Sequence, residues 1–238
     1  MNGDGPSYLS ERRPDVFQSR PWSPFAFVNL KLRRLIAELL TETAIPPGAT
    51  VVDYGCAQSP YVGLLPASTQ YIGADIEGNP EAAVILRPDG SVPLPDGSTD
   101  VVLSTQVLEH VIDPALYLAE CARLLRPGGS LVLTTHGIMF RHPDPEDYWR
   151  WTCDGLARIV QDAGFEVVQI RGAIGLLASA VMLFQWGAAV RMPGWLARPF
   201  IVVCQALMAL VDRFESEDAK KHDALVLGIR AVRPAVKD

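Results

Sequence analysis

The sequence predicts an α/β fold built on a doubly wound, Rossmann-like, mostly parallel seven-stranded sheet. Short runs rich in β-branched residues recur along the chain, as buried parallel strands require. Segments with helix caps and helix breakers separate several of these runs, which is typical of strand–helix alternation. The candidate strands are TVVDYG, YIGADI, AAVILR, DVVLSTQ, SLVLTTH, FEVVQI and ALVLGIRAV.

The flanking segments divide the chain into an arm and one domain. Residues 1–23 are polar and rich in Pro and Arg, so we expect an N-terminal arm, followed by a single domain over 24–238. Ser23 and Pro24 predict the start of the first helix, as a cap and a first-turn proline.

Two further helices are predicted from their caps and stops. Asp113 and Pro114 begin one that ends at the RPGG stretch, and Thr152 or Asp154 begins another that ends at Gly164.

Composition disfavours several function classes. The formal charge of −6 argues against nucleic acid as a main partner, because phosphate binding needs a basic face. The four cysteines lie far apart without a CxxC pair, so we expect neither a zinc site nor a disulfide framework, and a reducing, cytoplasmic setting fits best. The N-terminal residues contain no apolar run, so no secretory signal is expected.

The stretch VVDYGCAQSPY predicts a buried strand that runs into a ligand-binding loop. A nicotinamide dinucleotide is disfavoured, because Ala57 and Pro60 occupy the second and third glycine places of a GxGxxG turn. Asp53 would also place a carboxylate beside the phosphates of such a ligand. We therefore expect a ligand without phosphates near the loop.

A ligand with an amino-acid end fits the same loop better. Asp53 can face an ammonium group, Gly55 allows close backbone approach, and a helix starting at Ser59-Pro60 would favour a carboxylate. Asp75 ends the next strand, where an acidic side chain can bind ribose hydroxyls. Ammonium, carboxylate and ribose together describe S-adenosyl-L-methionine.

Four stretches, in order over residues 50–136, resemble class I S-adenosylmethionine-dependent methyltransferases of the broad type 11 group. They are VVDYGCAQSPY, YIGADI, PLPDGSTDVVLSTQVLEHVIDP and LLRPGGSLVLTTH. The family usually has glycine where this chain has Ala57. The resemblance implies the class I methyltransferase fold, S-adenosyl-L-methionine as cofactor, and these contacts: Asp53, Gly55 and Ala57 at its methionine end, Asp75 and Ile76 at the ribose, Asp89 and Gly90 at the adenine edge, and Gln106 near the methyl end.

His136 is the candidate catalytic residue. It ends the fifth predicted strand, on the rim where the reacting methyl group is expected, and its ordinary pKa near neutrality suits a general base. A loop histidine bonded to backbone is the alternative. Glu109 and His110 match part of a metal-binding Glu-x-x-Glu-His pattern of some family members, but Gln106 takes the first acidic place. We expect structural helix-start residues there and no metal.

Candidate substrate residues lie in the stretch HPDPEDYWRW. Polar groups interleaved with aromatic rings suit a sugar-like or amphipathic acceptor. Alternatively, the two tryptophans belong to the core and Asp147 pairs with Arg150 for structure. The stretch DYWRWTCDGL followed by AGFEVV also resembles methyltransferases of polysaccharide-modifying and lipid-modifying pathways. The candidates are His142, Asp147, Tyr148 and Arg150.

An apolar insertion at 173–216 precedes the last predicted strand and indicates a hairpin of two helices. Residues 172–190 carry no charge and are nominally long enough to span a bilayer. Against spanning, strands of one sheet must lie on both sides of the insertion. Three roles stay open: a packed lid or homodimer surface, shallow membrane attachment, and true spanning.

Taken together, these features predict a methyltransferase that acts on a small-molecule, glycan or lipid-linked acceptor, at a hydroxyl oxygen. The alternative is a degenerate methyltransferase-fold protein that binds a partner or a membrane through the apolar insertion. We expect a cytoplasmic protein, with membrane association left open.

Overall fold

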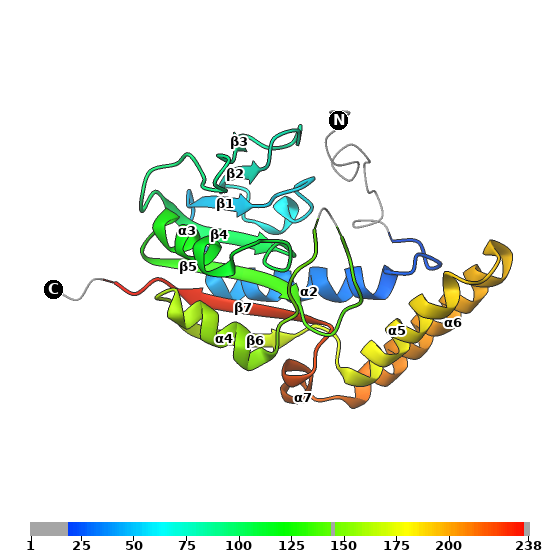
Figure 1. The fold of residues 1–238 in the computed structure, drawn as a ribbon. Helices are drawn as coiled ribbons and strands as arrows, with labels where there is room; N and C mark the ends of the chain where they lie inside the picture. The colour runs from blue at the N-terminus through cyan, green and yellow to red at the C-terminus, as the bar shows by residue number, and fades with distance from the viewer. Residues whose placement is uncertain (1–18, 144–145, 236–238) are drawn as a thin grey trace.

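The fold is seen in a computed structural model that describes residues 19–143 and 146–235. Its one sheet has seven strands in the order β3-β2-β1-β4-β5-β7-β6, all parallel except β7, which is antiparallel to both neighbours (Figure 1). The predicted seven-stranded sheet is confirmed. Most of the predicted arm lies outside the described residues. The strands are β1 Thr50–Tyr54, β2 Gln70–Asp75, β3 Val84–Ile85, β4 Thr99–Thr105, β5 Leu125–His136, β6 Glu166–Gly172 and β7 Val226–Val232.

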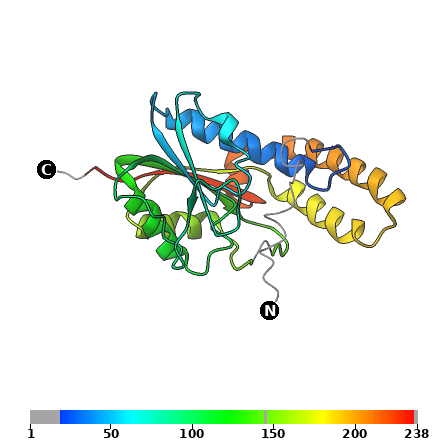
Figure 2. The same ribbon diagram turned by 90° about the horizontal axis from the view of Figure 1, so that it is seen from above.

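Helices cover both faces of the sheet, as Figure 2 shows from above. Helices α3, Pro114–Leu124, and α4, Cys153–Asp162, pack on one face, and α2, Ala26–Thr43, packs on the other. The predicted hairpin is present between β6 and β7 as α5, Leu176–Ala189, and α6, Gly194–Val211. The 3-10 turn η3, Asp212–Phe214, and α7, Glu217–His222, then lead into β7.

Each face of the sheet has its own apolar core, because successive strand residues point to opposite faces. Val52 of β1 lies in the core under α3 and α4, whereas Val51 lies in the core under α2. Helix α2 approaches β7 closely at Gly228, where an added Cβ would stand 2.8 Å from the side chain of Leu35. A glycine is therefore required at this crossing for steric reasons.

The predicted caps of α3 and α4 are confirmed. The Asp113 carboxylate accepts bonds from the amides of Ala115 and Leu116, and the Thr152 hydroxyl accepts from the amide of Gly155. Both caps satisfy amide groups that no helical carbonyl can reach.

Three predicted elements differ from the structure. Helix α2 begins at Ala26, because Ser23 and Pro24 form the turn before it. The stretch AAVILR forms only the two-residue strand β3. Ser59-Pro60 does not start an α-helix and is followed only by the 3-10 turn η2, Val62–Leu64. Gly63 and Pro66 interrupt that short connection, which excludes a longer helix.

Candidate functional site

Six of the eight predicted cofactor residues lie where the strand order reverses. Strand β1 lies between β2 and β4, so the loop after Asp53 stands between Asp75, the last residue of β2, and Gln106, which follows β4. Ligands of doubly wound sheets bind in the crevice at such a reversal. The fold therefore brings Asp53, Gly55, Ala57, Asp75, Ile76 and Gln106 to one edge of the sheet.

The loop after β1 adopts positive φ at two non-glycine residues as well as at Gly55. Ala57 has φ +44° and Ser59 has φ +52°, and Gln106 across the reversal point has φ +57°. Non-glycine residues rarely adopt this left-handed conformation, and residues held there cluster at functional sites. Gly55 has φ +83°, and an added Cβ would lie 2.5 Å from the side chain of Val107. Ala57 thus adopts a backbone conformation that glycine adopts readily.

Ala57→Gly is expected to raise the free energy of unfolding by about 0.5–1 kcal/mol, because it removes the strain of an L-residue at positive φ. Urea denaturation measures the change. The matched control is Ala37→Gly inside α2, which is expected to lower the free energy of unfolding by about 1 kcal/mol. If Ala57→Gly lowered the free energy of unfolding as much as Ala37→Gly, the backbone at Ala57 would not be strained.

Asp53 lies beneath the loop with no exposed surface. The Tyr71 hydroxyl lies 2.8 Å from its Oδ2 and 2.9 Å from the Ser59 Oγ, so it ties the carboxylate to the loop. The other oxygen, Oδ1, has no hydrogen-bond partner among the residues that the structure describes. Burial raises the Asp53 pKa to about 7, with a smaller contribution from the Asp75 charge and an opposing one from the Tyr71 bond. A buried carboxylate with one free oxygen fits a cationic or hydrogen-bonding ligand group, met directly or through water.

Asp75 closes the loop from the other side. Its Oδ2 accepts bonds from the Ala57 amide at 2.8 Å and from the Asn79 side-chain amide at 2.7 Å, and its Oδ1 accepts from the Ile76 amide. Asn79 also donates to the Ala57 carbonyl at 2.7 Å, so it holds both parts together. Sequence reasoning missed Asn79, because its role depends on a turn that brings it back toward β1.

The predicted adenine-edge residues stand in a turn after β3. The exposed Asp89 carboxylate accepts from the Ser91 hydroxyl and amide, and these bonds lower the Asp89 pKa. Gly90 has φ +85°, and its carbonyl accepts a bond from the Tyr54 hydroxyl, which ties the turn to β1. Sequence reasoning also missed Tyr54.

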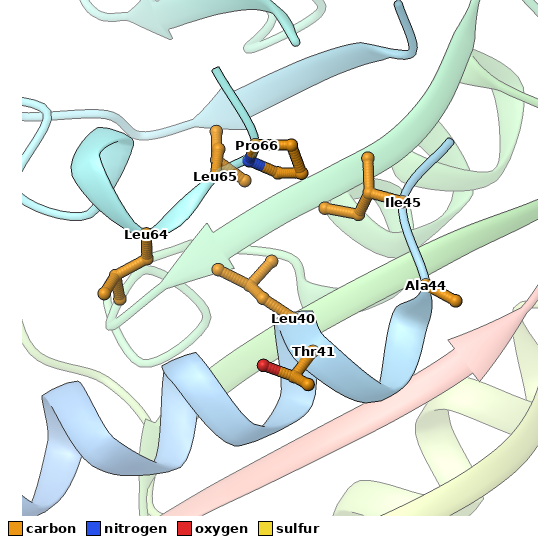
Figure 3. A pocket seen from close by; sticks show the side chains of 7 residues that line it. All are labelled: Leu40, Thr41, Ala44, Ile45, Leu64, Leu65 and Pro66. Atoms are coloured by element: carbon orange, nitrogen blue, oxygen red, sulfur yellow. The ribbon is translucent and has the colours of Figure 1, made fainter. Parts of the chain in front are cut away.

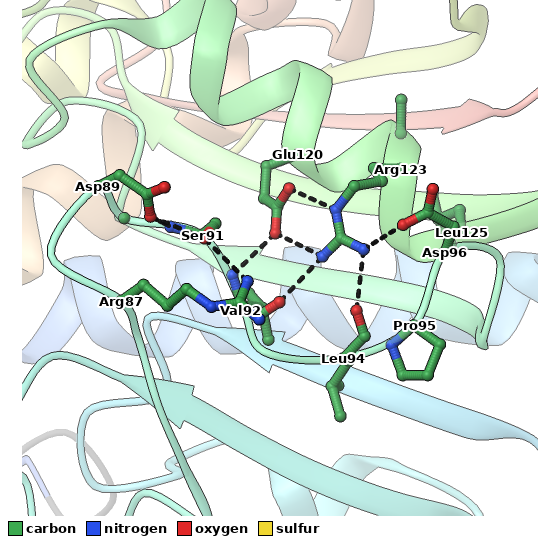
Figure 4. A network of polar contacts seen from close by, with 12 residues as sticks. Arg87, Asp89, Ser91, Val92, Leu94, Pro95, Asp96, Glu120, Arg123 and Leu125 are labelled. Atoms are coloured by element: carbon green, nitrogen blue, oxygen red, sulfur yellow. Dashed lines mark hydrogen bonds and ion pairs between the residues drawn. The ribbon is translucent and has the colours of Figure 1, made fainter.

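A single guanidinium fixes the segment that follows this turn. Figure 4 shows Arg123 of α3 bonded to Glu120 and Asp96 and to the backbone carbonyls of Val92 and Leu94. Glu120 in turn accepts from the Val92 amide at 2.8 Å. The loop that carries Asp89 is therefore anchored to a helix rather than left free.

His136 ends β5, and it lies beside two other histidines. Its ring centroid is 5.8 Å from that of His142 and 6.4 Å from that of His110. Burial lowers the His136 pKa to about 3, and the nearby His142 and Arg150 act in the same direction. The imidazole is therefore neutral at physiological pH and retains one acceptor nitrogen. Among residues 19–143 and 146–235, no group of three or more His, Cys, Asp or Glu side chains could hold a metal ion.

Glu109 is a third residue that sequence reasoning did not place in the site. Its Oε1 lies 3.3 Å from the His136 Nδ1, and neither atom has a hydrogen bond within the described part of the chain. The Thr135 hydroxyl donates to Oε2 at 2.8 Å, and burial raises the Glu109 pKa. The expected helix start at Glu109 and His110 is wrong, because both stand in a turn and α3 begins only at Pro114.

The candidate substrate residues lie in the loop after β5. Arg150 binds both oxygens of Asp147, at 2.6 and 2.7 Å, and donates to the carbonyls of Met139 and Phe140. Although burial raises the Asp147 pKa, the two Arg150 bonds to this carboxylate and one from the His142 amide lower it to about 2. Both charges are thus used inside the loop, as in the structural alternative. His142 stands beside His136, and Tyr148 is exposed.

A separate pocket of about 370 Å³ lies between the end of α2 and η2 (Figure 3). Its lining is apolar apart from Thr41 and contains no charged group, so it offers nothing to an ammonium or a carboxylate. It includes none of the predicted site residues.

Comparison with known proteins finds similarity to methyltransferases. A family described as a methyltransferase domain matches residues 26–170, which is more than half of the chain. A probable S-adenosylmethionine-dependent methyltransferase of Mycolicibacterium smegmatis is 30% identical over 52% of this chain and 55% of its own length. A ubiquinone biosynthesis O-methyltransferase of Xanthomonas oryzae is 36% identical over 37% of this chain and 43% of its own. The chain spans about half the length of the curated relatives that it matches.

Solved structures agree with the fold. The [4+2]-cyclase SpnF has a TM-score of 0.59 at 20% identity, covering 85% of this chain and 81% of its own. A chain of the complex between the Haloferax volcanii Trm112 methyltransferase activator and the putative methyltransferase has a TM-score of 0.58 at 19% identity, covering 98% and 99%. At such identities the likeness shows the fold alone, and the first of these folds serves a cyclase.

Proposed function

This chain belongs to the methyltransferase family whose model matches residues 26–170, and we propose a function from that premise. The proposed activity is transfer of a methyl group from S-adenosyl-L-methionine to a hydroxyl oxygen of a small-molecule, glycan or lipid-linked acceptor. The relatives named as S-adenosylmethionine-dependent methyltransferases support the cofactor, and those named as ubiquinone biosynthesis O-methyltransferases support a hydroxyl acceptor. The fold alone supports neither.

One observation carries the proposal: a loop with positive φ at Ala57 and Ser59 lies between two aspartates at strand ends. The unpartnered Asp53 Oδ1 suits the ammonium group of the cofactor, and the Asp75 carboxylate, with lone pairs left on its oxygens, suits the ribose hydroxyls. Ala57 stands where the family usually has glycine, and that departure favours the alternative of a degenerate binding protein. Because its backbone follows the glycine path, that alternative loses its support.

His136 is the proposed general base. When bound, the cofactor supplies an electrophilic methyl group on a sulfonium, so the protein mainly binds, aligns and removes a proton. The acceptor oxygen forms the new bond to carbon while the carbon–sulfur bond breaks toward sulfur. The hydroxyl proton passes to the neutral His136 imidazole. The low pKa of His136 makes it a weak base, and an ionised Glu109 beside it would stabilise the imidazolium that forms.

Cofactor affinity is expected to fall when the pH drops below 7. The Asp53 pKa is raised to about 7, so the carboxylate is ionised above that pH and becomes protonated and neutral below it. Protonation removes the attraction to an ammonium group, so the dissociation constant of S-adenosylhomocysteine should rise by up to about tenfold between pH 7.5 and pH 6. Calorimetry at the two pH values measures the change. Asp53→Asn should bind more weakly, with the same affinity at both.

The decisive test of the function is label transfer. The protein is incubated with methyl-labelled cofactor and with lipid, glycan and small-metabolite extracts, and each fraction is analysed by mass spectrometry. A labelled O-methyl product is expected in one fraction. Binding of S-adenosylhomocysteine without label in any fraction would refute methyl transfer. Label on nitrogen or carbon alone would refute the hydroxyl acceptor.

A further inference from the structure

The helical hairpin α5–α6 exposes apolar side chains, whereas a surface hairpin of a soluble protein exposes polar ones. Figures 1 and 2 both show the hairpin extending away from the sheet. A helix at a water-exposed surface turns its polar face outward. Here the exposed side chains are instead large and apolar: Leu176, Leu177, Leu183, Phe184 and Val190 in and just after α5, and Trp195, Leu196, Val202, Val203, Leu207 and Leu210 in α6.

The polar side chains of the hairpin point inward. Ser179 and Gln185 are buried, and Gln205 is half-buried. Gln205 donates to Gln185 and to the Pro24 carbonyl, and accepts from the Phe27 amide at 2.8 Å. The hydrogen-bonding groups therefore join the hairpin to the start of α2, and the outer faces carry apolar side chains apart from Arg191 and Arg198 near the turn. This inside-out arrangement is the one that a lipid environment requires.

The exposed apolar residues of α6 form one continuous stripe. Trp195, Val202, Val203, Leu207 and Leu210 recur at helical spacing, whereas the buried residues Ile201, Cys204 and Met208 occupy the opposite side. The segment 194–214 has a mean hydropathy of 1.7, yet only 17% of its apolar window is buried. A core helix of similar composition would be mostly covered.

The charges on the hairpin have a single sign. Between residues 173 and 211 the only charged side chains are Arg191 and Arg198, and the whole negative excess of the chain lies elsewhere. Both arginines are exposed near the turn of the hairpin, next to Trp195. Arginine and tryptophan at the edge of an apolar surface are typical of a membrane interface, where the cation reaches lipid phosphate.

The dimensions favour lying on a bilayer over crossing it. Helix α5 has 14 residues and is therefore about 21 Å long, which is too short for a hydrocarbon core of about 30 Å. Segment 194–214 is long and apolar enough to cross, but its far end returns through α7 to β7 in the same sheet as β6. Shallow insertion of the hairpin into one face of the bilayer is compatible with the short α5 and with the return of the chain from α6 to β7.

We propose that the outer faces of α5 and α6 dock this protein on a bilayer surface that contains anionic lipids. A second copy of the chain fits less well. A twofold contact through these faces would bury the two arginines among residues 173–211, which include no acid to pair with them. Lipid phosphates supply the missing partner. The proposal does not depend on methyl transfer.

The test is flotation with vesicles of phosphatidylcholine, with and without phosphatidylglycerol, using the full chain without cofactor. The protein is expected to float with the anionic vesicles. Phe184→Glu and Val203→Glu should each weaken binding at least about tenfold, because each places a charge in the apolar layer. The matched control is Leu116→Glu on α3, which is 70% exposed and should bind like the unchanged protein.

The charge dependence has its own variants. Arg191→Gln and Arg198→Gln are each expected to weaken binding to anionic vesicles by roughly fivefold, and to leave the weaker binding to neutral vesicles unchanged. Circular dichroism of every variant checks that the fold is kept. Failure to float with anionic vesicles would overturn the proposal. So would a dimer in sedimentation velocity that Val203→Glu dissociates while vesicle binding is absent.

Discussion

Asp75→Asn is expected to reduce the affinity for S-adenosylhomocysteine by about 10- to 100-fold, which is the range for hydrogen bonds to a charged group. The carboxylate accepts from the Ala57 and Ile76 amides and is the proposed acceptor for the ribose hydroxyls. An asparagine amide can accept through only one atom, and its NH2 group would face the donors of the loop. Isothermal titration calorimetry measures the loss directly.

The control for this prediction makes the same chemical change far from the strand ends. Asp162 lies exposed at the end of α4, paired with Arg158 at 2.8 Å. Asp162→Asn should leave ligand affinity unchanged, because an exposed ion pair on a distant helix contributes little even to stability. An Asp75→Asn protein that binds as tightly as the unchanged one would remove the ribose role.

His136→Ala is expected to lower kcat by about 10²- to 10⁴-fold and to leave the affinity for S-adenosylhomocysteine within about twofold. The physical reason is that the imidazole takes the acceptor proton but does not hold the cofactor. The measurement is turnover of the acceptor found by label transfer, with calorimetry on the same samples. His222→Ala is the matched control, since His222 is exposed on α7. Full turnover in His136→Ala would refute the base.

Glu109 is expected to act through His136 as a positioning residue. When ionised, its Oε1 attracts the proton of the imidazole to Nδ1, which leaves Nε2 as the acceptor. Glu109→Gln keeps the shape and the Thr135 bond but loses that preference. We expect kcat to fall by at least about tenfold with KM little changed, and the acid limb of the kcat profile to shift. A purely structural role would lower stability without moving the pH profile.

Much of the fold follows from local signals. The caps at Asp113 and Thr152 act on amides within a few residues, and the β-branched runs mark strands wherever both faces are buried. The strand-end acids Asp53 and Asp75 could be predicted for the same reason, because a strand end is itself a local signal. Two elements predicted from local signals differ from the structure: Ser59-Pro60 starts no α-helix, because Gly63 and Pro66 follow closely, and AAVILR forms only the short strand β3.

Distant contacts decided the remaining part of the site. Glu109 meets His136 only because β4 and β5 pair in parallel and end side by side, and neither residue signals the other along the chain. Asn79 holds Asp75 and the Ala57 carbonyl through a turn of the backbone. Arg150 and Asp147, two candidate substrate residues, instead pair with each other and stabilise the loop after β5.

The sequence by itself determined the strand runs, the helix caps, the two strand-end aspartates and an apolar hairpin before the last strand. Only the tertiary structure decided that Ala57 follows the glycine path, because bonds from its amide to Asp75 and from Asn79 to its carbonyl hold it there. It also decided which face of each hairpin helix turns outward. Periodicity places apolar residues on a helix face, but packing against α2 determines which face is covered.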